Sequence, residues 1–118
     1  MKITHYTEVK AENVNDKGAS KIKVRWLITR EMGAENFAMR LFEIEPGGSS
    51  PFHSHPWEHE VFIIDGQGHV LSPEGKKAFK PGDAIFIAPN EEHQFINSGS
   101  KMVKMLCLIP YKERAQQR

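Results

Sequence analysis

Three histidines within seven residues are the first chemical feature of this sequence. His53, His55 and His59 lie in the glycine-bounded stretch 47–66, GGSSPFHSHPWEHEVFIIDG. Residues two apart on an extended strand point to the same face, so the imidazoles of His53 and His55 should project together. Imidazole suits Zn, Cu, Fe and Ni, and Mn can also be held by nitrogen ligands. The spacing therefore predicts half of an octahedral metal site, and the flanking glycines favour it over a polar loop that happens to be rich in histidine.

The elements that must position these side chains are short strands. Turn signals rich in Gly, Pro, Asn and Asp recur every 8 to 12 residues, with little sign of helix. This pattern is typical of an all-β sandwich or barrel of about ten strands. The predicted strands are residues 3–9, 21–29, 37–45, the segment carrying His53 and His55, 61–64, 69–71, 76–79, 84–88, 93–97 and 102–109. The charged tail 111–118 is expected to be a short helix or a frayed end.

Composition limits the classes of protein to consider. The chain has 118 residues, which suits a single domain over 1–118, and a net charge of +1 from 16 basic and 15 acidic residues. Such a balance gives no reason to expect nucleic acid or an anionic membrane as partner. Cys107 is the only cysteine, so no internal disulfide can form. With no apolar run near ~20 residues and no apolar leader, we expect a cytoplasmic protein.

The strand 37–45 carries an arginine whose direction matters. Glu43 and Glu45 are costly to bury without partners and should face water. Alternation along a strand then turns the other set inward, namely Ala38, Arg40, Phe42 and Ile44. An arginine inside a barrel rarely serves packing alone, so Arg40 is a candidate for lining the site. The alternatives are a bulge that flips the phase and a pairing of Arg40 with a glutamate at the rim.

Two motifs in the chain resemble those of the cupin superfamily. The first, at 47–66, has Gly47, His53, His55, His59 and Gly66, and the second, at 82–97, has Gly82, Asn90, His93 and Asn97. The resemblance covers roughly residues 37–110. It implies a small double-sheet β-barrel of the jelly-roll type. It also implies one metal ion inside the barrel mouth, bound by two histidines and usually a glutamate of the first motif and one histidine of the second.

The chain departs from the usual cupin pattern at three positions. Ala88 replaces a proline, and Asn90 replaces a glycine but tolerates the left-handed conformation. His59 stands at the position where the motif usually has a glutamate, because only His59 is separated from Gly66 by the usual six residues. In an alternative alignment of the motif, Glu58 or Glu60 would be the carboxylate ligand.

The segments HSHPWEHE, PNEEH and LCLIP are similar to those of the small single-domain four-histidine cupins, which typically bind manganese. This resemblance implies that His53, His55, His59 and His93 bind one divalent ion. Mn²⁺ is expected first, and Fe²⁺, Ni²⁺, Cu²⁺ and Zn²⁺ stay open.

The last strand, 102–109, supplies further pocket and surface candidates. If Lys104 faces out, alternation turns a second set inward, namely Val103, Met105, Cys107 and Ile109. Cys107 is then either a redox participant near the metal or an inert buried thiol. Leu106 and Leu108 would face outward although they are apolar, which predicts a homodimer interface, as the family also implies, with Trp26 and Phe37 nearby.

Several residues around the first motif have two possible roles. Glu58 and Glu60 either hydrogen-bond to the metal-binding imidazoles or are solvated rim charges. Trp57 and Phe52 either shape the mouth of the barrel or cover its end. His5 and His69 show no ligand spacing and are expected at the surface.

The predicted ligand set suggests what the site could do. Four neutral imidazoles leave a divalent ion its full +2 charge, so the site should attract a small, anionic organic ligand. A metal-dependent oxidative enzyme of the dioxygenase type, with oxidative carbon–carbon cleavage as the first reaction to try, is the leading prediction. A Lewis-acid isomerase or decarboxylase is the rival within enzymes. A non-catalytic metal-loaded barrel that senses or stores a small molecule is the alternative outside them.

Overall fold

The computed structural model describes residues 1–111, so the prediction for the charged tail beyond Tyr111 lies outside the described part. Nine strands and two short 3-10 helices make up its regular structure. The helices are η1 (Tyr6–Glu8) and η2 (Arg30–Met32). The strands are β1 (Glu12–Asn13), β2 (Ser20–Ile28), β3 (Phe37–Ser49), β4 (His59–Asp65), β5 (Gly68–Ser72), β6 (Gly75–Phe79), β7 (Ala84–Ile87), β8 (Gln94–Ile96) and β9 (Val103–Pro110).

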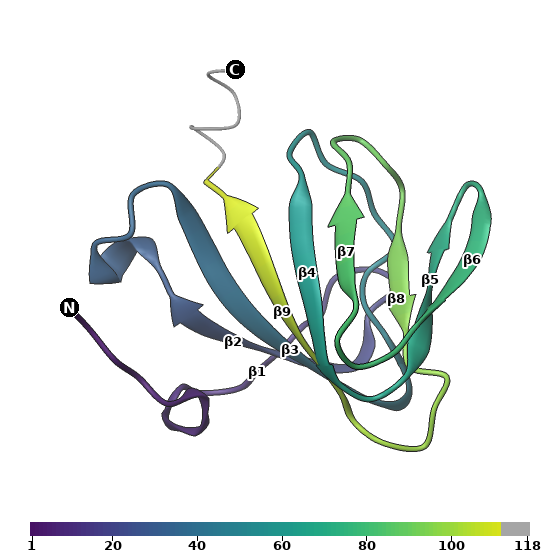
Figure 1. The fold of residues 1–118 in the computed structure, drawn as a ribbon, viewed down its shortest axis with the longest axis horizontal. Coiled ribbons are helices and arrows are strands. Elements are labelled where there is room, and N and C mark those ends of the chain that lie inside the picture. Colours follow the sequence, from purple (N-terminus) through teal and green to yellow (C-terminus); the bar gives the residue numbers. More distant parts are fainter. Residues whose placement is uncertain (112–118) are drawn as a thin grey trace.

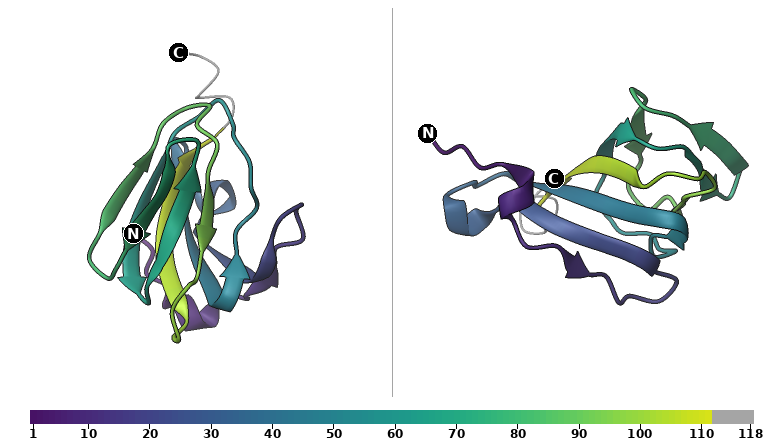
Figure 2. Two further views of the ribbon diagram at one scale, coloured as in Figure 1. Left: turned by 90° about the vertical axis from the view of Figure 1, so that its right-hand side faces the viewer. Right: turned by 90° about the horizontal axis from the view of Figure 1, so that it is seen from below.

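The strands form one antiparallel sheet that curls on itself. Its order is β6-β5-β8-β3-β9-β4-β7, with β2 also paired to β3 and β1 to β2. Figure 1 shows β2, β3, β9, β4 and β7 side by side, and β8, β5 and β6 closing the right-hand side. Figure 2 shows the same curl from the side and from below. The fold is the all-β jelly-roll barrel that the sequence predicts.

The long strand β3 joins the two halves of this sheet. Most of β3 pairs with β2 and β9, and its last residue, Ser49, pairs with Ser20 of β2 on one side and with Ile96 of β8 on the other. The chain therefore crosses from one half to the other just before the histidine segment begins. This crossing places the histidines between the two halves of the curled sheet.

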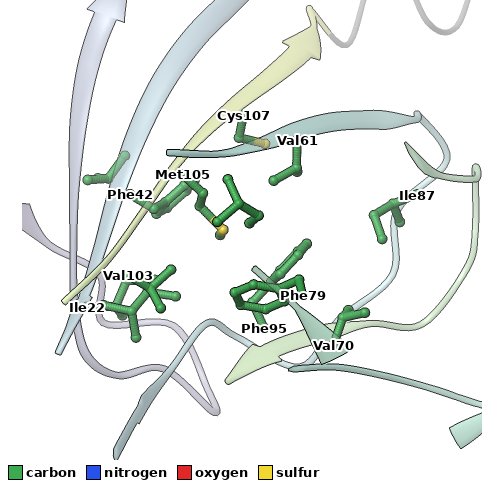
Figure 3. Close-up of a cluster of buried hydrophobic side chains, with 13 residues drawn as sticks. Ile22, Phe42, Val61, Val70, Phe79, Ile87, Phe95, Val103, Met105 and Cys107 are labelled. Atoms are coloured by element: carbon green, nitrogen blue, oxygen red, sulfur yellow. The ribbon is translucent and has the colours of Figure 1, made fainter. Parts of the chain in front are cut away.

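The core confirms the predicted alternation of β3 and β9. Ala38, Phe42 and Ile44 are buried, as are Val103 and Met105 on the neighbouring strand. Figure 3 shows such side chains converging from both halves of the sheet. Each fully buried apolar side chain of this size contributes roughly 1.5–3 kcal/mol. The inner face of β3 and β9 therefore forms much of the apolar core that packs against the histidine segment.

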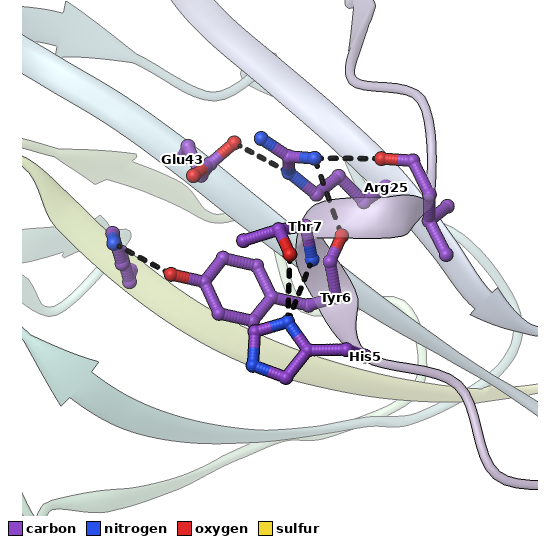
Figure 4. A network of polar contacts seen from close by, with 7 residues as sticks. His5, Tyr6, Thr7, Arg25 and Glu43 are labelled. Carbon is purple, nitrogen blue, oxygen red and sulfur yellow. Dashed lines mark hydrogen bonds and ion pairs between the residues drawn. The ribbon is translucent and has the colours of Figure 1, made fainter.

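The predicted edge strand at residues 3–9 is wrong, because this segment holds helix η1 and no strand. The carbonyl groups of Tyr6 and Val9 accept hydrogen bonds from Nη1 of Arg25, at 3.2 Å and 2.6 Å (Figure 4). Because a side chain of β2 binds these two carbonyl groups, the segment lies across the outer face of the sheet. The only strand before β2 is the two-residue β1, inside what the sequence indicated as a loop.

Glu43 was predicted to face water, but its side chain is largely buried. It does lie on the outer face of β3, but its side chain is only 12% exposed and pairs with Arg25 at 2.9 Å. Leu41, on the same face, is 2% exposed. The N-terminal segment therefore covers part of the outer face, whereas Glu45 remains exposed as predicted.

No helix among residues 1–111 is long and apolar enough to span a membrane.

Candidate metal centre

His53 and His55 lie in the loop between β3 and β4, which corrects the prediction of a regular strand. Pro51 and Pro56 flank the two histidines. Proline has no N–H to give to a ladder, so pairing cannot extend through this segment. The segment keeps one isolated antiparallel β-bridge, between His53 and His93. The amide of His53 donates to the carbonyl of His93 at 3.2 Å, and the amide of His93 donates to the carbonyl of His53 at 3.0 Å.

That bridge brings the two motifs together. One ring nitrogen from each of His53, His55 and His93 lies within 4.8 Å of the other two. Asn90 supports the arrangement, because its amide donates to the carbonyl of His55 at 2.7 Å. It has the positive φ of +67° that the sequence led us to expect of a residue replacing glycine.

His59 is the first residue of β4 and points inward against this triad. It is 7% exposed, and its ring stacks on His55 with the centroids 4.2 Å apart. The next residue, Glu60, is exposed on the outer face of β4, and Glu58 lines a different cavity together with it. Neither carboxylate lies among the residues that line the histidine cavity, so His59 is the nearest candidate for a fourth ligand.

The hydrogen bonds of the rings assign their tautomers. Nδ1 of His55 lies 2.9 Å from the carbonyl oxygen of Trp57, and Nδ1 of His93 lies 2.8 Å from that of Glu91. A carbonyl can only accept, so both Nδ1 atoms carry the proton and both Nε2 atoms carry the lone pair. Nε2 of His55 is buried without a hydrogen-bond partner. This buried lone pair fits a metal ion, because neutral imidazole is the commonest metal ligand in proteins.

Burial lowers the pKa of three of the imidazoles, those of His53, His55 and His59, and so keeps them neutral. It lowers the pKa of His53 to about 4, and the charges of His93 and His55 act in the same direction. It lowers the pKa of His59 to about 2, again with help from the neighbouring rings and from Arg40. The pKa of His55 is also lowered, chiefly by burial. Because a protonated imidazole cannot bind a metal, these shifts leave the ligands ready at neutral pH.

The histidines open onto a cavity of about 360 Å³ with mostly apolar walls. Three of the four histidines line it. The other lining residues are Glu12, Asn13, Val14, Asn15, Asp16, Val24, Trp26, Arg40, Phe42, Ser50, Pro51, Phe95, Met105 and Cys107. A cavity of this size and composition is typical of sites for small molecules.

Arg40 points into this cavity, as the alternation of β3 predicts. Its guanidinium lies 4.8 Å from the ring centroid of Phe42 and 5.4 Å from that of Trp26. One Nη2–H donates to Sγ of Cys107 at 3.1 Å, and Nε is buried without a hydrogen-bond partner. The guanidinium is held between aromatic rings and still has a donor without an acceptor, so it can bind an anion that enters the cavity.

Cys107 joins Arg40 to the histidine cluster. It is 2% exposed, and its Sγ lies 3.5 Å from Nδ1 of His59. Burial raises the pKa of this thiol, although the charge of Arg40 acts against the shift. The thiol is therefore a hydrogen-bonding link within the site at neutral pH.

Sequence reasoning missed two parts of the cavity wall. The segment 12–16 looked like an ordinary polar loop, yet all five of its residues line the cavity. Trp26 was grouped with the predicted dimer interface, although its alternation with Ile22 and Val24 already placed it on the inner face.

The remaining candidates lie around or away from the cavity. Trp57 stacks on His55, with centroids 4.6 Å apart, whereas Phe52 is 49% exposed. His5 caps helix η1, and the ring of His69 contacts Ser98, both apart from the cluster.

Comparison with known proteins agrees with this geometry. The family model described as "Cupin domain" matches residues 40–109. The structure of the polyketide cyclase RemF from Streptomyces resistomycificus is 38% identical in sequence, with a TM-score of 0.88 over 93% of this chain and 79% of that one. The oxalate-binding protein of Thermotoga maritima is 28% identical over 114 residues, which is 91% of this chain and 92% of that protein.

A third relative matches only in part. The 1-methylthio-D-xylulose 5-phosphate methylsulfurylase of Rhodospirillum rubrum is 32% identical over 71 residues, or 60% of this chain. The match spans 46% of that enzyme's length. These relatives have different names and activities on a shared fold, so function must be argued from the site.

Proposed function

Because the chain belongs to the cupin family, we propose that it is a metal-dependent enzyme that binds a small organic anion between a histidine-bound divalent ion and Arg40. The observation that carries the proposal is the position of Arg40. Its guanidinium shares one cavity with the convergent histidines and has a buried Nε without a partner. A carboxylate or enolate oxygen entering there would meet two positive charges.

In this proposal the ligands are His53, His55, His59 and His93, with Mn²⁺ as the expected ion and Fe²⁺, Ni²⁺, Cu²⁺ or Zn²⁺ as alternatives. The buried, unpartnered Nε2 of His55 supports the assignment. A bound divalent ion would act as a Lewis acid that polarises an oxygen atom of the substrate. When His59 binds through Nε2, its Nδ1–H donates to Cys107, which fixes the orientation of the ring.

The residues around the metal have separate tasks. Arg40 binds and orients the anionic group of the substrate, and Cys107 holds the guanidinium in place through its 3.1 Å hydrogen bond. The apolar side chains of Phe42, Phe95 and Met105 exclude water, which strengthens both electrostatic contacts.

We place Lewis-acid reactions of carbonyl compounds first, namely isomerisation, decarboxylation or ring closure. The 38% identical relative is a polyketide cyclase, which supports this order. The dioxygenase-type reaction predicted from the sequence is the second candidate, favoured by the water-excluding apolar walls. Product formation under nitrogen supports the first reaction class, and consumption of oxygen together with substrate supports the second. Binding without turnover would favour a sensor or storage role, an alternative that the Thermotoga maritima relative supports through its name, oxalate-binding protein.

The anion site is tested by titrating metal-loaded protein with oxalate in a calorimeter. Replacing Arg40 with Met should weaken oxalate binding about tenfold or more, because a charge-assisted hydrogen bond is lost. Metal content should stay the same, since Arg40 is not a ligand. Lys23→Met, on the exposed side of β2, is the matched control. Equal oxalate affinities in wild type and Arg40→Met would refute the proposal.

We further propose that the chain forms a homodimer in the cytoplasm. An apolar groove lies on the outer face of β4, β7 and β9, where Phe62 and Phe86 are 47% and 59% exposed. Leu106 and Leu108 line the same groove, which supports their predicted role. A second copy of this chain would cover it. The free, buried thiol of Cys107 is consistent with a reducing compartment.

A further inference from the structure

We propose that the metal cavity continues into a second binding subsite on the far side of Trp26, which receives the tail of an elongated, flat, polyoxygenated substrate. The inference rests on the proposed function, since the anionic end of that substrate lies at Arg40 and the metal. It extends that function by naming the shape and chemistry of the rest of the molecule.

Two cavities meet at the open edge of β2. Beside the metal cavity lies another of about 580 Å³, and Glu12 and Trp26 line both. The remaining residues of the second cavity are Thr29, Arg30, Glu31, Ala38 and Tyr111. In Figure 1 this region is the outer end of β2 and β3, away from β8. A ligand that begins at the metal can therefore continue along the inner face of these strands.

Aromatic rings backed by guanidinium groups define the shape of this path. The indole of Trp26 is 39% exposed and has Arg40 at 5.4 Å from its ring centroid. In the second cavity, the guanidinium of Arg30 lies 4.1 Å from the ring centroid of Tyr111. Exposed aromatic faces of this kind bind flat, conjugated molecules by stacking. The body of the ligand should therefore be planar and lie against Trp26.

The charges of the second cavity indicate what its end of the ligand carries. Arg30 is accompanied there by Glu12 and Glu31, so the lining is mixed in sign. The Tyr111 hydroxyl is buried and makes no hydrogen bond with the described residues. A second full anion would be repelled by the two carboxylates, whereas neutral hydroxyl groups can donate to these carboxylates and neutral carbonyl groups can accept from the Tyr111 hydroxyl. The tail is therefore polyoxygenated and uncharged.

Three probes separate the subsite from the metal end. Oxalate is short and occupies only the metal end, 2-naphthoate adds a flat two-ring body, and 6-hydroxy-2-naphthoate adds a hydroxyl at the far end. Each is titrated calorimetrically into metal-loaded wild type, Trp26→Ala and Thr29→Trp. Thr29→Trp fills the second cavity without touching the first, and it keeps the test valid if Trp26→Ala fails to fold.

We expect Trp26→Ala and Thr29→Trp each to weaken both naphthoates about tenfold, the scale of a lost aromatic contact. In Thr29→Trp, oxalate binding should change by less than about twofold, because Thr29 lines only the second cavity. In wild type the 6-hydroxy compound should bind more tightly than 2-naphthoate. Phe37→Ala removes an aromatic ring of β3 that is 57% exposed and lines neither cavity, so it should affect no probe.

The results distinguish the two proposals. If the naphthoates bind equally well to wild type and both variants, the subsite is refuted, whatever oxalate does. If the hydroxyl gives no gain, the polyoxygenated tail is refuted. If oxalate fails to bind wild type while the naphthoates still depend on Trp26, the proposed anion site falls and the subsite stands.

Discussion

At the scale of single residues, the centre depends on which nitrogen each histidine presents. Backbone carbonyl groups hold Nδ1 of His55 and His93, so Nε2 is directed away from the backbone in both. His59 differs, because its Nδ1 contacts a thiol instead of a carbonyl group. The identity of Cys107 therefore bears on His59, the proposed ligand at the position where the usual cupin pattern has a glutamate.

Removing His59 should reduce metal affinity, while removing the neighbouring carboxylate should not. We expect His59→Ala to bind its ion at least about tenfold more weakly than wild type, since loss of a residue that only orients a metal ligand already costs that much affinity. Glu58→Ala is the matched control, because Glu58 lies outside the histidine cavity. Elemental analysis after dialysis gives the readout. Full occupancy in a His59→Ala, His93→Ala double variant would contradict the ligand assignment.

Acid should destabilise the metal-free protein. The pKa of His59 is 6.5 when the chain is unfolded and about 2 when it is folded, so below pH 6.5 the unfolded state binds the additional proton. Stability is therefore lost as the pH falls below 6.5. At pH 5, His59 alone accounts for about 2 kcal/mol relative to pH 7.

Urea unfolding of the chelator-treated protein at pH 7 and pH 5 measures this loss. His59→Gln removes the titrating ring and should reduce the difference between the two pH values. The same replacement at His69, whose ring only contacts Ser98, should leave it unchanged. A wild-type stability that is the same at both pH values would contradict this prediction.

At the scale of elements, sequence patterns predicted the strands better than the segments between them. Alternation assigned the inward faces of β3 and β9 correctly, including Arg40, because burial of one face leaves a clear period of two. It could not assign residues 3–9, where an arginine from β2 binds the backbone carbonyl groups. It also gave no reason to bring the polar segment 12–16 to the cavity, because that placement depends on tertiary contacts.

The contact between the N-terminal segment and β2 should matter for stability. Arg25→Met leaves the Glu43 carboxylate largely buried without its cation and frees the carbonyl groups of Tyr6 and Val9. We expect a loss of about 1–3 kcal/mol, the usual range for unsatisfied buried polar groups. Denaturant unfolding compares this variant with Lys23→Met, an exposed neighbour on the same face of β2. Equal losses in the two variants would mean that the network contributes nothing specific.

At the scale of the whole molecule, we propose that the inner face of the barrel serves chemistry and that its outer face serves association. The sequence predicted both, because Leu106 and Leu108 alternate with the inward-facing Met105 and Cys107. It could not identify the exposed Phe62 and Phe86 as part of the same patch. Phe62 lies in β4, which pairs with β9, and Phe86 lies in β7, which pairs with β4, so the three strands meet only after folding.

A charge placed in the outer groove should separate the proposed dimer. Wild type should have about twice the 13.5 kDa mass of one chain by light scattering at micromolar concentration. Phe86→Glu should shift it to the single-chain mass, because a carboxylate would be buried without a partner. Phe52→Glu alters a similarly exposed phenylalanine outside the groove and should not change the mass. A wild-type mass near that of one chain would refute the dimer.

The paired backbone bonds between His53 and His93 also set an order of events during synthesis. His53, His55 and His59 leave the ribosome early, but His93 follows only after β4 to β7 have been made. Until then the histidine loop has no bridge to hold it, and the cluster lacks one of its three convergent rings. In the proposed metal centre, capture of an ion would therefore be a late step in the synthesis of the chain, and a chain stalled before β8 would be released without it.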